Sequence, residues 1–423
     1  MIVSEFILTK LIVQTNEMNR SSHTILLSLA CFLILFSCQQ EKEHSIESST
    51  TQTLTISDGG IKTLALEDGV NFEVLTALKL STINNKEYIT FYDRITHSIY
   101  LYDYQTNDLF KKISMEKDGP NAVKSANKFF IHTIDSIFVD GSMGIHLINS
   151  KGEVLTKKSK GTKLRNGIPM IQMGAPTYSF DHDSHFENGK IEMSIHLFNR
   201  TGKNYERSIY DFEKDSIVEK FVQTKTLIYD YKEVLRVKEE AKKRREGAFN
   251  ITMYFGSYKN YLYGSTSISD SLYIFNDGEL IKTIYAGVPT IEVASYSDYA
   301  TLRIIEYFEG GMSAFENPKQ PAHYKNMLLS PNGRLIYRVL YHGTKPQFIE
   351  GEEKASPYVF GATLIVVDTK TEELHYYNLP VDEIELGMPF NFNLFVSNEG
   401  IFFRVKDQQN EDQVQFRFFK VTQ

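Results

Sequence analysis

The stretch Tyr261–Ala286 reads YLYGSTSIS, DSLYIFND and GELIKTIYA, and its pattern decides the fold. Three apolar runs alternate with short polar turns, and Asn276-Asp277-Gly278 separates the last two runs. Asp-Gly and Asn-Gly pairs accept the positive φ angles of two-residue turns, so they predict a β-hairpin. Leu272–Phe275 is apolar at every position, whereas a strand with one buried face alternates. We therefore expect a short strand covered on both faces, as in the blades of a β-propeller.

The same unit recurs along most of the chain, and a repeat of this length indicates a repeat architecture. The last group of strands has only three members, and a lone strand at Ile61–Leu66 can supply the fourth. Such closure removes exposed sheet edges. The sequence therefore predicts an all-β fold, a six-bladed β-propeller over residues 59–423 closed by an N-terminal strand. The third group is irregular, so five or seven blades remain open. The six groups are Glu73–Met115, Phe129–Lys158, Thr177–Gln223, Asn250–Ala286, Tyr324–Leu379 and Phe392–Val421.

Two segments depart from the strand pattern and predict short helical insertions between blades. Tyr231–Gly247 carries apolar residues on one side, with acidic residues four positions before basic ones, which supports a helix. Ser297–Phe308 begins with an N-cap residue and ends at Gly310-Gly311. The basic residues between Lys232 and Arg245 either form a solvated face or contact lipid headgroups, an acidic glycan or a membrane transporter.

Composition limits the classes of function. The chain has 423 residues, 42% of them apolar, and a net charge of −7. A nucleic-acid-binding protein shows a basic field, so we expect no nucleic-acid partner. The only cysteines are Cys31 and Cys38, in or just after the one hydrophobic segment. The body of the chain therefore has no disulfide, no cysteine-ligated zinc and no cysteine nucleophile.

The N-terminus reads as an export signal. Ile25–Phe36 is apolar but too short for a comfortable transmembrane helix, and Arg20 precedes it. We expect residues 1–37 to be a signal peptide and residues 38–58 a flexible tether. Met18 opens a better signal sequence than Met1, so we expect translation to start there.

The run Leu35-Phe36-Ser37-Cys38 resembles the lipobox of bacterial lipoproteins, with a bulky phenylalanine at a position usually occupied by a smaller residue. Together with the six repeats and Asp118-Gly119-Pro120-Asn121, it makes the chain similar to a group of Bacteroidetes lipoproteins with propeller-like repeats. The resemblance implies a six-bladed propeller, a lipid on Cys38 and a location at the outer membrane, facing the periplasm or the cell surface. No reaction is established for that group, so the resemblance implies fold and location only.

Ligand-binding candidates are few, and each has a structural alternative. Asp181, His182, Asp183 and His185 are the densest run of metal-binding residue types, but one strand rarely completes a site. A polar loop between blades explains them equally, and we predict no metal and no cofactor. Asp118–Asn121 either presents backbone amides to a ligand or forms a rigid turn.

Other candidates lie on predicted inner strands or near strand ends. The tyrosines can stack on sugar rings or simply pack the blades, and the histidines can serve an enzyme. These candidates are Tyr178, Tyr254, His323, Tyr324 and His342.

No common catalytic motif occurs in the sequence. We therefore expect a lipid-anchored, non-catalytic binding or scaffold module for a glycan, peptide or partner protein. The alternative is a propeller enzyme, a glycan-active hydrolase or lyase, that uses loop histidines and carboxylates; His182, His323 and His342 are its candidates.

Overall fold

The computed structural model describes one compact unit, Leu54–Gln423. Within that unit the described residues are 54–71, 75–124, 126, 128–141, 144–159, 164–165, 168–169, 177–179, 186–196, 205–214, 216–223, 253–277, 279–293, 322–347, 356–359, 361–386, 393–406, 408 and 410–422. The two predicted helices, Tyr231–Gly247 and Ser297–Phe308, lie outside these residues. Among the residues that are described, no helix is long and apolar enough to cross a membrane.

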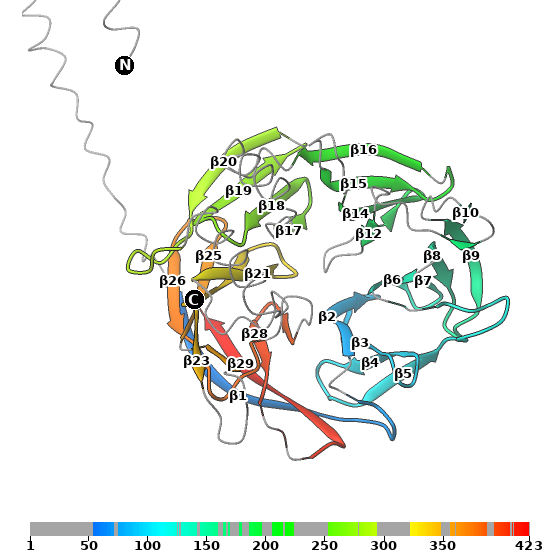
Figure 1. Ribbon diagram of the computed structural model, residues 1–423, viewed down its shortest axis with the longest axis horizontal. Coiled ribbons are helices and arrows are strands. Elements are labelled where there is room, and N and C mark those ends of the chain that lie inside the picture. Colours follow the sequence, from blue (N-terminus) through cyan, green and yellow to red (C-terminus); the bar gives the residue numbers. More distant parts are fainter. Residues whose placement is uncertain are drawn as a thin grey trace, which may run out of the picture. The chain divides into compact units, whose positions relative to one another are not determined.

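Six antiparallel sheets form a ring, so the fold is a six-bladed β-propeller, as predicted (Figure 1). Blade 1 comprises β2 (Leu75–Ile83), β3 (Lys86–Asp93), β4 (Ser98–Asp103) and β5 (Leu109–Ser114). Blade 2 comprises β6 (Lys128–Thr133), β7 (Ser136–Gly141), β8 (Gly144–Ile148) and β9 (Val154–Ser159). Blade 3 comprises β12 (Thr177–Ser179), β14 (Lys190–His196), β15 (Tyr205–Asp211) and β16 (Ser216–Gln223), with β13 (Phe186–Glu187) paired to β14.

The other three blades include the closing one. Blade 4 comprises β17 (Met253–Tyr258), β18 (Tyr261–Thr266), β19 (Ser271–Asn276) and β20 (Glu279–Tyr285). Blade 5 comprises β21 (His323–Leu329), β22 (Leu335–Tyr341), β25 (Ala362–Asp368) and β26 (Leu374–Asn378). Blade 6 comprises β27 (Leu394–Val396), β28 (Gly400–Arg404), β29 (Gln413–Thr422) and β1 (Thr55–Ala65). Two short hairpins lie outside the blades and were not expected: β10 (Leu164–Arg165) with β11 (Ile168–Pro169), and β23 (Thr344–Gln347) with β24 (Ser356–Val359).

The hydrophobic core lies between successive blades, which explains the continuous apolarity of Leu272–Phe275. Leu272 and Ile274 pack toward blade 5, in a cluster with Ile336 and Ile365. Tyr273 and Phe275 lie on the opposite face of the same strand, in a separate cluster. Because successive strand residues point to opposite faces, a strand that is covered by a blade on each side must be apolar at both its odd and its even positions. The third strand of blade 4 is therefore covered on both faces, as expected.

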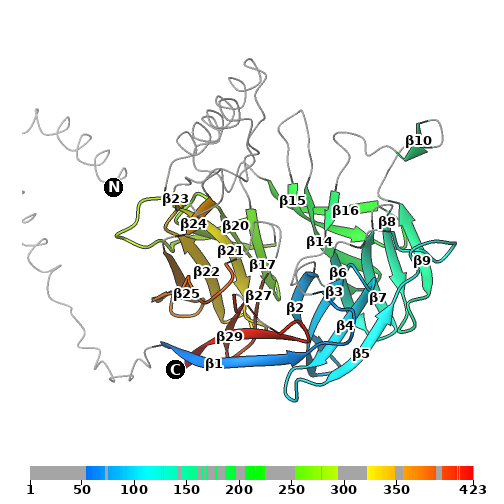
Figure 2. The same cartoon turned by 60° about the horizontal axis from the view of Figure 1, so that its bottom comes forward.

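The ring closes where the two ends of the described chain pair. β1 runs antiparallel to β29 from Thr55 opposite Thr422 to Ala65 opposite Gln413, with one irregularity after Asp58. Figure 2 shows the two long strands side by side at the edge of blade 6. β1 starts before the expected Ile61, and it supplies the fourth strand that the sequence of blade 6 lacks.

An acidic or amide side chain caps the hairpin after the third strand in four blades. In blade 3, Asp211 Oδ1 accepts a hydrogen bond from Lys214 N at 2.9 Å. Asp103 Oδ1 accepts hydrogen bonds from the backbone N–H groups two and three residues later, at 2.9 and 3.0 Å. Asp368 Oδ1 does the same at 2.8 and 3.2 Å, and Asn149 Oδ1 accepts from the second and fourth residues after it. Such side-chain caps replace backbone bonds that the turn leaves open. Gly152 completes the blade 2 turn at φ +82°, where an added Cβ would lie 1.9 Å from the Ser114 carbonyl oxygen.

We expect Leu64→Ala in β1 to lower the free energy of unfolding by about 2–5 kcal/mol, because Leu64 is completely buried between blades 6 and 1. Ile61→Ala in the same strand is the matched control, since Ile61 is 53% exposed, and it should change stability by less than about 0.5 kcal/mol. Urea unfolding of the full chain measures both variants. Equal losses from the two substitutions would contradict closure by β1.

Candidate functional site

Some of the site residues predicted from the sequence lie within the described part of the chain, and others lie outside it. Asp181, His182, Asp183 and His185 lie outside the described residues. Tyr178 lies in β12, but its side chain is also outside the description. Within the described residues, no group of three or more His, Cys, Asp or Glu is placed to hold a metal ion.

Two of the predicted tyrosines meet at the packed interface of blades 4 and 5. The Tyr254 hydroxyl donates a hydrogen bond to the Tyr324 carbonyl oxygen at 3.3 Å, and the Tyr324 hydroxyl donates one to Asp270. Arg338 lies over the Tyr324 ring, with its guanidinium carbon 3.8 Å from the ring centroid. Tyr324 and Arg338 are both completely buried. Burial raises the pKa of Tyr324 and lowers the pKa of Arg338.

Arg338 of blade 5 links its blade to blade 4 through hydrogen bonds. It donates hydrogen bonds to the carbonyl oxygens of Ala286 and Ser269, each at 2.7 Å, and both acceptors belong to blade 4. A buried charge needs such compensation because its removal from water costs several kcal/mol. Its guanidinium is held by these carbonyls and stacked on Tyr324, so the cluster packs blades 4 and 5 together.

The two predicted histidines also belong to the packing of blade 5. His323 is 4% exposed and its ring centroid lies 5.7 Å from that of Tyr341. His342 Nε2 lies 2.8 Å from Thr363 Oγ1, and burial lowers the pKa of His342. The Asp118–Asn121 loop is a backbone-bonded turn, in which Ala122 N donates to the Gly119 carbonyl oxygen at 3.2 Å.

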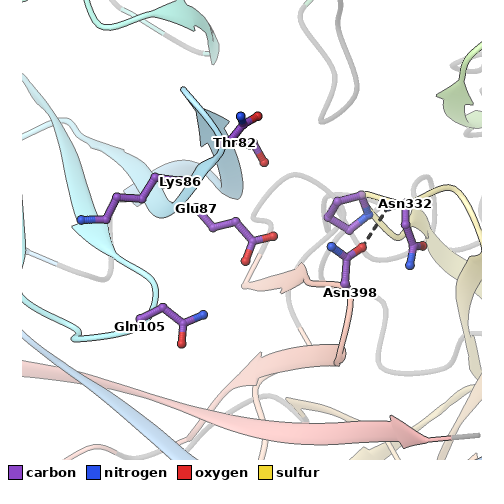
Figure 3. Close-up of a pocket in the computed structure, with 8 residues that line it drawn as sticks. Thr82, Lys86, Glu87, Gln105, Asn332 and Asn398 are labelled. Carbon is purple, nitrogen blue, oxygen red and sulfur yellow. Dashed lines mark hydrogen bonds between the residues drawn. The ribbon is translucent and has the colours of Figure 1, made fainter.

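A polar hollow of about 520 Å³ lies where the turns of three blades meet, and we call it the turn cavity (Figure 3). The turn between β2 and β3 contributes most of one wall, and Asn84 and Asn85 in that turn have φ of 49° and 61°. Two positive φ angles in a row are typical of a tight two-residue hairpin. The lining residues are Thr82, Asn85, Lys86, Glu87, Gln105, Pro331, Asn332 and Asn398.

Hydrogen bonds hold the opposite wall, which comes from blades 5 and 6. Asn332 N donates to Asn398 Oδ1 at 2.9 Å, the bond drawn as a dashed line in Figure 3. Asn332 Oδ1 in turn accepts from Arg334 N at 3.0 Å. The two asparagine turns are therefore fixed to each other, and the cavity is preorganised on this side.

Glu87 is the one acidic residue that the described part of the chain contributes to the lining. Burial raises the pKa of its carboxyl, and the neighbouring Glu399 carboxylate raises it further. Glu399 accepts a hydrogen bond from the Tyr104 hydroxyl at 3.4 Å, and that hydroxyl also lies 3.2 Å from Ser397 Oγ. Burial is the main cause that raises the pKa of Tyr104 to about 12.

The nearby lysines are bound to protein groups. Lys86 Nζ forms an ion pair with Asp103 at 2.5 Å, and this pairing raises the pKa of Lys86 and lowers that of Asp103. Lys62 of β1 donates to the Tyr104 carbonyl oxygen at 2.6 Å, and burial lowers its pKa. The closing strand therefore also supports the wall of the turn cavity.

The turn cavity suits hydrogen bonding to a polar ligand more than catalysis. Four of its eight lining side chains are amides, which both donate and accept hydrogen bonds. Of the candidates whose side chains are described, Tyr254, His323, Tyr324 and His342, none lines it. The sequence signal that could have identified this cavity is the position of three asparagine-containing turns. The runs INNKE, SPNGR and SNEGI each join the first and second strands of a blade, so their asparagines lie at the same end of the ring.

The comparisons with known proteins support the family and the fold. Residues 45–375 match the model of a domain of unknown function, DUF4221, and the chain belongs to this family. The chain is similar to a crystal structure of a DUF4221 member from Bacteroides vulgatus, with 15% identity, TM-score 0.61 and coverage of 87% of this chain and 98% of that one. It is also similar to a protein of Bacteroides fragilis described as exported, with 9% identity, TM-score 0.51 and coverage of 88% and 96%. No curated protein matches the sequence.

We expect Arg338→Met to lower the free energy of unfolding by about 2–4 kcal/mol, because the carbonyl oxygens of Ala286 and Ser269 lose charged donors. Arg338→Lys should recover only part of the loss, since lysine cannot donate in two fixed directions. Urea unfolding measures the change. A variant that stays fully stable while losing a ligand would show that this cluster is a binding site.

Proposed function

We propose that this DUF4221 propeller is a lipid-anchored binding module of the cell envelope that holds a polar ligand in the turn cavity. The observation that carries the proposal is the convergence of turns from blades 1, 5 and 6 on one hollow in which half of the lining side chains are amides. Amides and hydroxyls can pair with the hydroxyls of a glycan or the backbone of a peptide. An outer-membrane location is part of the same proposal.

Two observations favour an exported, anchored protein. The lipobox-like run ends at Cys38, and the compact unit begins at Leu54, so 15 residues separate the cysteine from the propeller. The similar Bacteroides fragilis protein is described as exported. Several acyl chains on one cysteine anchor stably, where a single chain gives only marginal binding.

The enzyme alternative gains no specific support from the described residues. Its candidate His182 lies outside the described residues, while His323 and His342 lie in the packing of blade 5 and neither lines the turn cavity. General acid–base catalysis requires groups that converge within hydrogen-bond reach of one reacting atom. Mass spectrometry of ligands after incubation with the protein would reveal any cleavage product, and cleavage would favour the enzyme.

A panel of neutral glycans and short peptides tests the binding site. We expect at least one class to bind the full-length protein in calorimetry, and the double variant Asn85→Ala with Asn398→Ala to weaken it by about 10-fold or more through lost hydrogen bonds. The control is Lys117→Ala, an exposed residue outside the cavity lining. Binding that survives the double variant would place the ligand elsewhere.

Cys38→Ala tests the anchor separately. We expect the wild-type protein to incorporate a labelled fatty acid and fractionate with membranes, and the variant to incorporate none because the acceptor sulfur is gone. Cys31→Ala is the matched control, since Cys31 lies inside the predicted signal peptide. Labelling of the Cys38→Ala variant would contradict lipid attachment at that residue.

A further inference from the structure

We propose that the turn cavity recognises an organic ammonium group, held by the Glu87 carboxylate and flanked by the amides of Asn398 and Gln105. The inference rests on the proposed function, because it names the ligand chemistry of the same cavity. Amino sugars and free peptide amino termini both carry this group, so the shared chemistry is the protonated amine.

The position of Glu87 is the first support. Glu87 lies in the lining of the cavity, and its side chain projects from blade 1 toward the turn that carries Asn398 (Figure 3). Among the described residues, none forms an ion pair or side-chain hydrogen bond with the Glu87 carboxylate. The carboxylate is half-buried, and a partly desolvated charge gains from a partner of opposite sign.

The placement of the nearby cations is the second support. Among the described residues, Lys86 is the only cationic one in the lining, and its ammonium group pairs with Asp103. The Lys62 ammonium group donates to the Tyr104 carbonyl oxygen, beside Glu399 rather than at Glu87. Because both lysines are bound to other protein groups, a ligand can supply the positive charge that pairs with Glu87.

The amides determine which uncharged polar groups of the ligand can form hydrogen bonds with the cavity. Asn398 Oδ1 is occupied by Asn332 N, so its amide nitrogen is the group that can donate to a hydroxyl or carbonyl oxygen of a ligand. An anionic ligand would meet the negative charges of Glu87 and Glu399 and be rejected. The cavity therefore fits a polar molecule that carries a primary amine and several hydrogen-bonding oxygens.

The charge of Glu87 predicts how affinity responds to pH. The titratable groups that interact with it electrostatically are Glu399 and Tyr104. Of the other nearby charges, Lys86 is paired with Asp103, and Lys62 interacts with Glu399 and Asp103. Burial and the Glu399 carboxylate raise the pKa of Glu87, so its proton is lost later than in free glutamate as pH rises. Affinity for an ammonium ligand should increase as pH rises through this pKa and stay high until the ligand amine itself loses its proton.

Matched pairs of ligands test the inference on the full-length protein. One pair is a glucosamine trimer and its fully N-acetylated form, and the other is trialanine amide with a free or an acetylated amino terminus. We expect the amine member of at least one pair to bind about 10-fold or more tightly than the acetylated member in calorimetry, because charge-assisted hydrogen bonds are the stronger kind. Glu87→Gln should remove that difference, because the neutral amide of glutamine does not form an ion pair with the ammonium group. Glu279→Gln, on the exposed outer strand of blade 4, should change nothing.

The outcomes separate this inference from the proposed function. Acetylated members that bind the cavity as tightly as the amines overturn the ammonium inference and leave the binding module standing. A preference for the amine that survives Glu87→Gln overturns the role of Glu87. Failure of all four compounds to bind also overturns the inference, whereas the proposed function is then decided by the neutral panel and the asparagine double variant.

Discussion

The pairing of β1 with β29 is the constraint on which the other features depend. A ring of blades whose ends did not meet would expose two sheet edges with unpaired N–H and C=O groups. Here the strand at the start of the propeller completes the blade formed by its last three strands, from Thr55 opposite Thr422 to Ala65 opposite Gln413. The same strand carries Lys62, which bonds to the Tyr104 carbonyl oxygen beside the turn cavity. Closure and the candidate site therefore share one element.

The interface of blades 4 and 5 and the turn cavity have different chemistry. The interface of blades 4 and 5 is held by Arg338, whose guanidinium is buried against Tyr324 and bonded to two carbonyl oxygens. The turn cavity instead presents amides and the half-buried Glu87 to solvent. A satisfied buried network fixes a structure, whereas convergent polar groups in a hollow can exchange water for a ligand. Because of this difference, we assign binding to the cavity and not to the described candidates Tyr254, Tyr324, His323 and His342.

Much of the fold could be predicted from the sequence because blades obey local rules. Leu272–Phe275 is apolar at every position, which predicts a strand covered on both faces. Blade 6 lacks a fourth strand in its own part of the sequence, which predicts closure by a strand from the N-terminal side. The hairpin of β23 and β24 was missed because it interrupts blade 5 between paired strands. The site was missed because its residues are ordinary turn formers, such as Asn85, and only the closed ring brings them together. Arg338 could not be interpreted either, since its acceptors are backbone carbonyls more than 50 residues away in the chain.

Labelling of a single cysteine in living cells tests the central claim, that the turn cavity holds a ligand in the envelope. The propeller contains no cysteine, so Gln105→Cys in the cavity wall and Lys117→Cys on the exposed surface each provide one reporter thiol there. The rate of reaction with a membrane-permeant maleimide is compared between cells and the purified protein. We predict that Gln105→Cys reacts more slowly in cells than when purified, while Lys117→Cys reacts at the same relative rate in both. Equal protection of the two thiols, or none at Gln105→Cys, would contradict an occupied turn cavity.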